Sequence, residues 1–339
     1  MSEAGTTEKA NVTAVSAATM NIAAAPHLAG GQLTTRRMML DVLIALAPVV
    51  GMSIYVFGWP AVAQIALCAA SCLAAEAIFT AMRGKPQTLG NLSAVVTGVI
   101  LALSIPGSPP CPRFVGVIGS FTAVGVGKII FGGLGQNIFN PAMVGRAFVM
   151  MAFPAMIGAS GYVLAGSPDV VSQATPMVLY KQQGQVTGLW ELFWGLTNGS
   201  LGETSAAACL LGGLYLCIRR TASWEIPAGV LAAAALLAGL KNLTQMDSQW
   251  TVLHHLFGGA LMFGAFFIAT DPVTSPLTPR GKFLFGACIG ALVIVFRLFS
   301  GYPEGVMFAV LLMNSLVPLI NRWMIPRPVG GSPPVRAGR

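Results

Sequence analysis

A polar segment between two apolar blocks carries the residues with the most specific chemistry. Residues 169–176 form a D-x-x-S-x-A-T-P string. Thr175 offers a single hydroxyl between small Ala174 and a proline, so a modifying enzyme can reach it and nothing bulky stands beside a new ester bond. We expect Thr175 to be an attachment point for a phosphate-bearing group, with Asp169, Ser172 and Ala174 in the same site. Taken alone, so short a pattern is also compatible with an ordinary exposed loop.

The composition is that of an integral membrane protein. Of the 339 residues, 55% are hydrophobic and 9% are charged, and the mean hydropathy is +0.74, whereas soluble proteins average about 25% charged residues. The net charge of +8 does not indicate nucleic-acid binding, because the basic residues separate apolar segments and form no stripe. Residues 1–35 have no apolar core of the signal-peptide type.

The six cysteines and three histidines do not indicate a metal centre. No two cysteines form a C-x-x-C pair, and most lie inside apolar runs, where cysteine acts as a small hydrophobic residue. Cys68 and Cys72 share one helix face, which suits helix packing or a metal ligand pair. The histidines, His27, His254 and His255, have no ligand spacing with them. We expect no metal site built by this chain.

Ten apolar runs are long enough to cross about 30 Å of hydrocarbon. They predict an all-α integral membrane protein whose spans lie near residues 39–57, 60–82, 91–106, 114–131, 143–161, 204–218, 222–240, 253–270, 283–299 and 304–323.

The distribution of lysine and arginine predicts the orientation of these spans. With the amino terminus inside, 15 of the 19 basic residues lie on or near the cytoplasmic side, which is the asymmetry that membrane insertion produces. The outer side keeps only Arg113, Lys181, Lys241 and Arg297. We therefore expect both termini in the cytoplasm and the Thr175 loop outside, in the periplasm of a Gram-negative bacterium.

An internal repeat supports an even division of the spans. SPPCPR (residues 108–113) returns as SPLTPR (residues 275–280), at an offset of 167 positions. Five spans separate the copies, so the second half is inverted relative to the first, and inverted repeats place functional groups near the midplane on broken helices. Chance similarity between proline-rich loops is the alternative. The expected units are a cytoplasmic tail, a first repeat, an outer loop, a second repeat and a second cytoplasmic tail, at residues 1–35, 36–161, 162–203, 204–323 and 324–339.

Three carboxylates near the apolar segments are candidates for an ion pathway. Glu76 lies well inside its span, where a charge costs about 2.5–3.5 kcal/mol even on insertion scales. Asp271 follows an apolar span and Glu304 begins another. For Glu76 a structural hydrogen bond to a neighbouring helix is an equal alternative, and for the other two simple interfacial solvation is.

Five blocks in a fixed order resemble the D subunit of the Rnf complexes and, more distantly, the B subunit of the sodium-translocating NADH:quinone reductases. The resemblance covers nearly the whole chain, and its strongest block is FGGLGQNIFNPAMVGRAFVMMAFP, residues 131–154. The other blocks lie at residues 36–48, 169–176, 269–281 and 302–321. Two positions depart from the family, with Gln173 where glycine is frequent and Asn321 where many relatives have an acidic residue.

The resemblance implies a polypeptide without a catalytic residue of its own, in a membrane complex that couples electron transfer between ferredoxin and NAD to movement of Na+ or H+. It implies flavin mononucleotide (FMN) esterified to Thr175 by an FMN transferase, and a second, non-covalent riboflavin near the repeat interface. It also implies the A, B, C, E and G subunits of an Rnf complex as partners in the lipid bilayer of the bacterial inner membrane. The alternatives are the B subunit of the quinone reductase and a urea-transporter-like channel with the same inverted repeats and no redox function.

Overall fold

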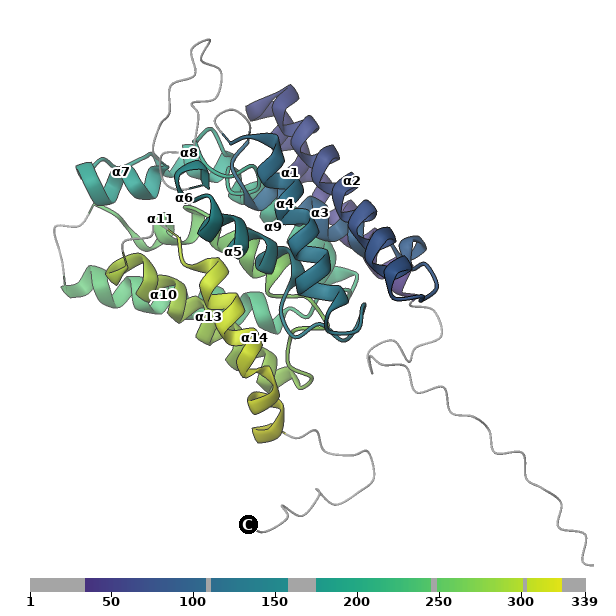
Figure 1. Cartoon of the computed structure of the whole chain (residues 1–339). Helices are drawn as coiled ribbons and strands as arrows, with labels where there is room; N and C mark the ends of the chain where they lie inside the picture. The colour runs from purple at the N-terminus through teal and green to yellow at the C-terminus, as the bar shows by residue number, and fades with distance from the viewer. Residues whose placement is uncertain (1–33, 108–110, 158–174, 245–248, 301–303, 325–339) are drawn as a thin grey trace, which may run out of the picture.

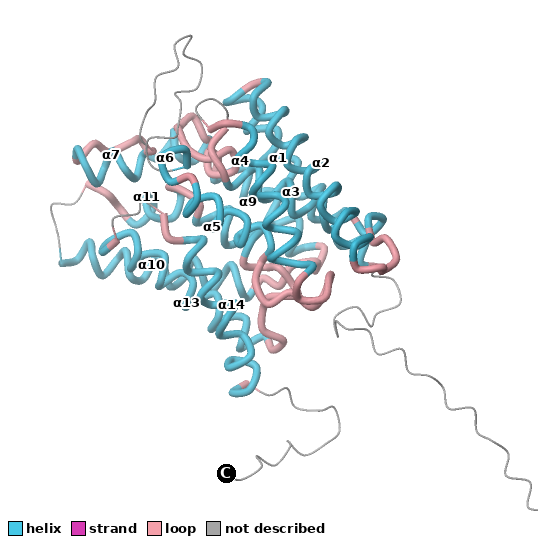
Figure 2. Tube along the Cα trace, viewed as in Figure 1, coloured by secondary structure: helices cyan, strands magenta, loops and turns pink. Residues whose placement is uncertain are grey.

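Apolar helices make up the body of the protein. The computed structural model describes residues 34–107, 111–157, 175–244, 249–300 and 304–324, and over these ranges it contains helices and loops but no strand (Figures 1 and 2). Within the described ranges, five helices are long and apolar enough to cross a membrane, namely α1, α2, α10, α13 and α14, and three apolar helices are shorter. The expected all-α membrane architecture is confirmed.

The first half of the chain contributes five of the predicted spans. Pro48 is accommodated inside the first helix, and Asn140 caps the amino end of the fifth by accepting a hydrogen bond from the Met143 amide at 3.3 Å. The elements are α1 (Thr35–Phe57), α2 (Trp59–Met82), η2 (Leu89–Asn91), α3 (Ser93–Ser104), α4 (Arg113–Val124), the π-helical η3 (Gly125–Ile129), α5 (Pro141–Ala152) and α6 (Pro154–Ile157).

The outer loop expected from the sequence contains two short helices, α7 (Pro176–Gln183) and α8 (Leu189–Trp194). Both lie at the end of the bundle where α6 and α11 also lie (Figure 1).

The second half contains helices at the remaining five predicted spans, and the helix at the eighth of the ten predicted spans is interrupted. Its helix ends at Phe257 and resumes at Leu261. The elements are α9 (Ala206–Ile218), α10 (Glu225–Thr244), α11 (Val252–Phe257), α12 (Leu261–Phe263), the π-helical η4 (Gly264–Ile268), α13 (Pro279–Phe299) and α14 (Val306–Trp323).

The internal repeat has a counterpart in the backbone. Leu92 and Gly259 have φ angles of 63° and 69°, and they stand 167 positions apart, which is the offset of the two proline-rich motifs. Leu92 is the residue before α3, and Gly259 lies two residues before α12. A left-handed conformation is unusual for leucine, so its recurrence at this offset indicates that both halves share a backbone turn at this point.

A polar contact between Asn140 and Asn314 joins the two halves. The backbone amide of Asn140 donates to Asn314 Oδ1 at 3.1 Å, and the side-chain amide of Asn140 donates to the Ile268 carbonyl at 3.2 Å. Asn314 in turn donates to the Thr274 carbonyl at 3.0 Å. Because both side chains are buried, these bonds replace the hydration that the side chains lose on folding.

Two glycines let α13 pack directly on α10. A β-carbon at Gly286 or Gly290 would collide with the backbone carbonyls of Ile226 and Val230. Small residues four apart are a common device for close helix packing in membranes, where van der Waals contact replaces the hydrophobic effect as the driving force.

Gly290→Ala should therefore lower the free energy of unfolding by about 1–3 kcal/mol, the usual range for overpacking, and lower the melting temperature in detergent. Gly51→Ala is the matched control, because Gly51 is also helical and a β-carbon there meets nothing within 4 Å. Equal melting temperatures for the two variants would show that the α10–α13 contact does not depend on Gly290.

Candidate functional site

Thr175 stands at the amino end of α7 and is buried. It is 5% exposed, and its side chain makes no cap hydrogen bond to the helix. Within the described part of the chain, its hydroxyl oxygen has no hydrogen-bond partner. A buried hydroxyl without a partner is unfavourable and asks for an explanation. The other residues expected in this site, Asp169, Ser172 and Ala174, lie outside the described residues.

The position of Thr175 at the amino end of α7 favours a phosphoester. The first amides of a helix lack partners within the helix, and the helix dipole favours a negative group at that end. Esterification would also replace the unpartnered hydroxyl. The expectation that this hydroxyl is accessible differs from the structure, because α7 folds it against the bundle; an enzyme that modifies Thr175 must act on a state in which this contact is open.

A small cavity lies beside Thr175. Its volume is about 10 Å³, close to the space needed by one water molecule, so a flavin ring system cannot lie in it. Two carboxylates, those of Glu203 and Glu304, are part of its lining. The other lining residues are Thr175, Pro176, Met177, Leu192, Thr197, Asn198, Gly199 and Gly259.

Both carboxylates lie close to one guanidinium. Arg146 of α5 donates from both terminal nitrogens to Glu203 Oε1, at 3.3 Å each, and its Nη2 lies 3.8 Å from Glu304 Oε2. The Ala260 amide donates to Glu304 Oε1 at 2.9 Å. Glu203 precedes α9 and Glu304 precedes α14, so the cluster ties together three distant segments and the helix break after α11.

A second arginine binds the backbone carbonyls at the helix break after α11. Arg297 of α13 is 1% exposed and donates to the carbonyls of His255 and Gly258, the latter at 2.7 Å. These carbonyls end α11 and would otherwise lie unsatisfied in the interior. The sequence predicts Arg297 on the outer side of the membrane, and the structure shows that its side chain is buried within the protein.

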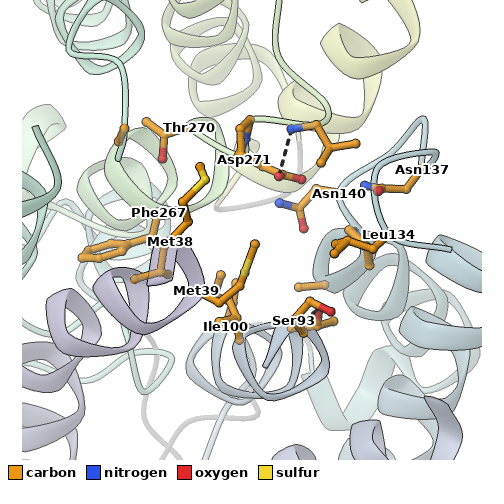
Figure 3. A pocket seen from close by; sticks show the side chains of 18 of the residues that line it. Met38, Met39, Ser93, Ile100, Leu134, Asn137, Asn140, Phe267, Thr270 and Asp271 are labelled. Atoms are coloured by element: carbon orange, nitrogen blue, oxygen red, sulfur yellow. Dashed lines mark hydrogen bonds between the residues drawn. The ribbon is translucent and has the colours of Figure 1, made fainter. Parts of the chain in front are cut away.

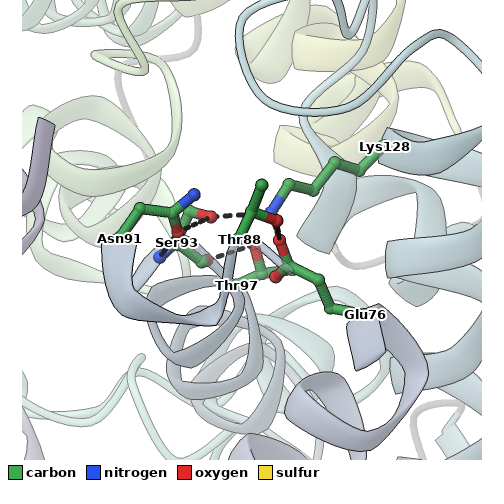
Figure 4. A network of polar contacts seen from close by, with 6 residues as sticks. All are labelled: Glu76, Thr88, Asn91, Ser93, Thr97 and Lys128. Carbon is green, nitrogen blue, oxygen red and sulfur yellow. Dashed lines mark hydrogen bonds and ion pairs between the residues drawn. The ribbon is translucent and has the colours of Figure 1, made fainter. Parts of the chain in front are cut away.

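The equivalent turn in the first half, before α3, has its own ion pair. Lys128 of η3 donates to Glu76 Oε1 at 2.9 Å and to the Ser93 hydroxyl, at the start of α3, at 2.6 Å. Thr88 donates to the same Glu76 oxygen at 2.6 Å, so the four residues form one network (Figure 4). Both charged side chains are almost fully buried. The structure thus shows the alternative role expected for Glu76, a structural contact with a neighbouring helix, in the form of a salt bridge with Lys128.

A larger cavity lies between the two halves of the chain. Figure 3 shows Met38 and Met39 of α1, Ile100 of α3, Leu134 of the loop after η3 and Phe267 of η4 around it. The polar residues of its lining include Ser93, Thr97, Lys128, Asn137, Asn140, Thr270 and Asp271. A largely apolar wall with a few convergent polar groups is typical of a cofactor pocket.

The three predicted ion-pathway carboxylates fall into two places. Asp271 lines the central cavity and accepts hydrogen bonds from Val273 and Thr274, both at 3.2 Å. Glu76 reaches the same cavity through Lys128. Glu304 belongs instead to the Thr175 cluster.

Sequence reasoning missed four of the buried charges, namely Lys128, Arg146, Glu203 and Arg297. For the three basic residues a signal was present, since each falls inside a predicted span, where a charge is costly unless it is paired. Cys68 and Cys72 are both free and buried in α2. Cys72 Sγ lies 3.9 Å from the Ser120 carbonyl of α4, which places this pair in helix packing.

Comparison with known proteins gives the family. The model of the NQR2, RnfD, RnfE family matches residues 21–330. The chain belongs to this family. The resemblance expected from the sequence is confirmed.

Members of the family named as D subunits are similar over nearly their whole length. The D subunit of the ion-translocating oxidoreductase complex of Stutzerimonas stutzeri is 40% identical over 326 residues, covering 87% of this chain and 92% of that protein. The D subunit of the Na+-translocating ferredoxin:NAD+ oxidoreductase complex of Acetobacterium woodii is 39% identical, with 90% and 93% covered. The corresponding protein of the proton-translocating complex of Clostridium ljungdahlii is 36% identical, with 90% and 94% covered.

Glu76→Gln should lower the free energy of unfolding by about 3–5 kcal/mol, because it leaves Lys128 buried without its partner charge. Lys128→Met should have a similar effect, whereas the double variant should recover most of the loss. Melting temperatures in detergent measure the cycle, with Glu191→Gln as the control at an exposed carboxylate. A double variant less stable than either single variant would contradict a paired role.

Proposed function

We propose that this chain is the D subunit of a bacterial complex that couples electron transfer between ferredoxin and NAD+ to translocation of Na+ or H+. The similarity to D subunits of sodium- and proton-translocating complexes supports this function. Thr175 carries FMN through a phosphoester in this proposal. The observation that carries the cofactor assignment is the buried Thr175 hydroxyl at the amino end of α7, which has no hydrogen-bond partner among the described residues.

The bound FMN supplies electron transfer, and the chain supplies its position. Thr175 holds the phosphate at a helix end that suits its negative charge. The cavity that Leu192 and Glu203 line beside Thr175 has no room for a ring system, so the ring of a flavin held by Thr175 would have to lie outside this cavity. Ferredoxin and NAD+ are bound by partner proteins, for which the A, B, C, E and G subunits of the Rnf complex are the candidates.

The central cavity is the site we propose for a non-covalent riboflavin. Its apolar side chains, among them Met38 and Phe267, would contact a flat ring system, and Asn137, Asn140 and Thr270 offer hydrogen-bonding groups. The cavity has a volume of about 90 Å³ and would have to widen to admit the ring. Both halves of the chain line it, as expected for a site at the repeat interface.

We assign the inner end of the ion pathway to Glu76 and Asp271. Glu76 Oε2 and Thr80 Oγ1, one turn further along α2, are buried and have no hydrogen-bond partner among the described residues. Two such oxygens suit a small cation or a proton. We propose that the chain lies in the bacterial inner membrane with both termini in the cytoplasm. In this orientation Glu76 lies toward the cytoplasm and Thr175 lies in the periplasm.

Thr175→Ala should abolish the flavin that remains on the chain after denaturation, while flavin released by acid is unchanged. Met39→Trp, which fills the central cavity, should abolish the flavin that acid releases and leave the covalently bound flavin unchanged. Mass spectrometry of the intact chain and fluorescence of a denaturing gel measure the covalent part, and Thr197→Ala is the control in the same cavity as Thr175. Fluorescence that stays with the Thr175→Ala chain excludes the attachment site.

Glu76→Gln should lower ion uptake per electron in proteoliposomes that contain the whole complex, because a neutral amide cannot bind and release a cation as a carboxylate does. Assembly is checked by size-exclusion chromatography, and Glu191→Gln again serves as the control. An assembled Glu76→Gln complex with unchanged uptake per electron leaves Glu76 with its structural role alone.

A further inference from the structure

A pocket at the ends of α7, α10 and α13 brings together three of the four basic residues that the sequence predicts on the outer side of the membrane. Lys181 of α7, Lys241 of α10 and Arg297 of α13 all line this pocket, which has a volume of about 750 Å³. The fourth, Arg113, does not line it. Because basic residues are scarce on the outer side of membrane proteins, the convergence of three of them from distant segments calls for an explanation.

The pocket also has an apolar side that is open to the surroundings of the protein. Leu240 of α10 and Leu298 and Phe299 of α13 belong to its lining, and they are 52%, 36% and 83% exposed. Exposed apolar side chains near the ends of membrane helices contact lipid. The ring of Tyr180 lies in the lining between these residues and the basic groups of α7, as aromatic side chains do at the boundary between lipid and water.

The two lysines give the pocket a positive charge. Lys241 Nζ donates to the Tyr180 hydroxyl at 3.4 Å and lies 5.4 Å from the centre of that ring. Both groups are neutral, and within the described ranges Lys241 forms no salt bridge. Lys181 donates to the Ser300 carbonyl at 3.1 Å. The described lining of the pocket contains no carboxylate, so an anion is the ligand that complements its charge.

A buried imidazole in the lining has hydrogen-bonding capacity that the described residues do not use. His255 of α11 is 1% exposed, and neither of its ring nitrogens has a partner among those residues. A neutral imidazole carries one donor and one acceptor, and buried groups of this kind find a partner in protein, water or ligand. Since His255 lines the pocket, the oxygen atoms of a polar headgroup in the pocket can provide that partner.

Helix electrostatics offers an alternative explanation for the basic residues. Lys181, Lys241 and Arg297 each stand in the last turn of a helix, where the helix dipole favours a positive charge. Arg297 also binds the carbonyls at the end of α11, so its charge already has a structural use. The dipole accounts for each charge separately. It accounts neither for the space between them nor for the imidazole of His255.

We propose that this pocket binds one anionic phospholipid. Lys181 and Lys241 bind its phosphate, and its acyl chains lie along the exposed apolar side chains at the ends of α10 and α13. Basic pockets between membrane helices are known to take anionic headgroups. In the orientation proposed above, the lipid belongs to the outer leaflet of the inner membrane. Because Lys181 is part of α7, the bound lipid also ties the helix that begins after Thr175 to α10, whether or not Thr175 carries a flavin.

The first experiment measures lipid binding to the full chain by native mass spectrometry in detergent. Phosphatidylglycerol should bind more tightly than phosphatidylcholine with the same acyl chains. Lys181→Gln and Lys241→Gln should each weaken phosphatidylglycerol binding about fivefold, and the double variant about 25-fold, since a basic residue near anionic headgroups contributes about that factor. Arg113→Gln is the matched control, because it removes an exposed outer charge that does not line the pocket. Arginine at both lysine positions should preserve binding.

Three results overturn the proposal. One is wild-type affinity for phosphatidylglycerol in the double glutamine variant. Another is equal affinity of the wild type for phosphatidylglycerol and phosphatidylcholine, since the lysines would then not recognise the anionic headgroup. The third is displacement of the lipid by an equal concentration of inorganic phosphate, because the site would then take a free phosphate without using the acyl chains.

Thermal stability separates lipid binding from a role of the lysines at helix ends alone. Phosphatidylglycerol added to the delipidated chain should raise the melting temperature of the wild type and of Arg113→Gln, and should raise that of the double glutamine variant by less. A role at helix ends alone lowers the melting temperature of the double variant by the same amount with and without the lipid, and that result also contradicts the proposal.

Discussion

The need to satisfy broken helices inside a membrane shapes the whole structure. Where a helix stops in hydrocarbon, its last carbonyls and the first amides of the next helix lose their partners, and lipid cannot replace them. The chain has a turn with a left-handed residue before α3, at the end of an exposed connection, and such a break before α12. Lys128 binds Ser93 at the first, while Arg297 binds the carbonyls of His255 and Gly258 at the second. Each basic side chain then needs a carboxylate nearby, which explains why the buried charges gather at these two points.

The two sites have the same backbone conformation at Leu92 and Gly259 but differ in the charged side chains around them. The first is surrounded by one acid and one base, Glu76 and Lys128, and is neutral as an ion pair. The second has two acids and two arginines, and the acids share their nearest partner. An inverted repeat thus gives a common frame on which each half has specialised. The neutral pair borders the central cavity, and the larger cluster borders Thr175.

Much of the fold could be predicted from the sequence, because hydrophobic length is a strong local signal. Each of the ten predicted spans overlaps a helix, and the repeat offset of SPPCPR and SPLTPR recurs in the φ angles of Leu92 and Gly259. The partners of the buried charges could not be predicted. Arg146 and Glu203 are 57 positions apart, and no local pattern records which distant segments a fold brings together. Similarly, the string around Thr175 indicates a modifiable hydroxyl, but its burial depends on how α7 packs.

The contact between Asn140 and Asn314 has a consequence for how the chain is made. The two residues are 174 positions apart, so at synthesis rates of about 5–20 residues per second, roughly 10 to 35 s pass before the second one exists. During that interval the first repeat already lies in the membrane, with the Asn140 side chain lacking its partners on the second half. The nascent half-protein must therefore persist as an incomplete intermediate, sheltered by its own helices or by the insertion machinery, until translation delivers the segment that completes it.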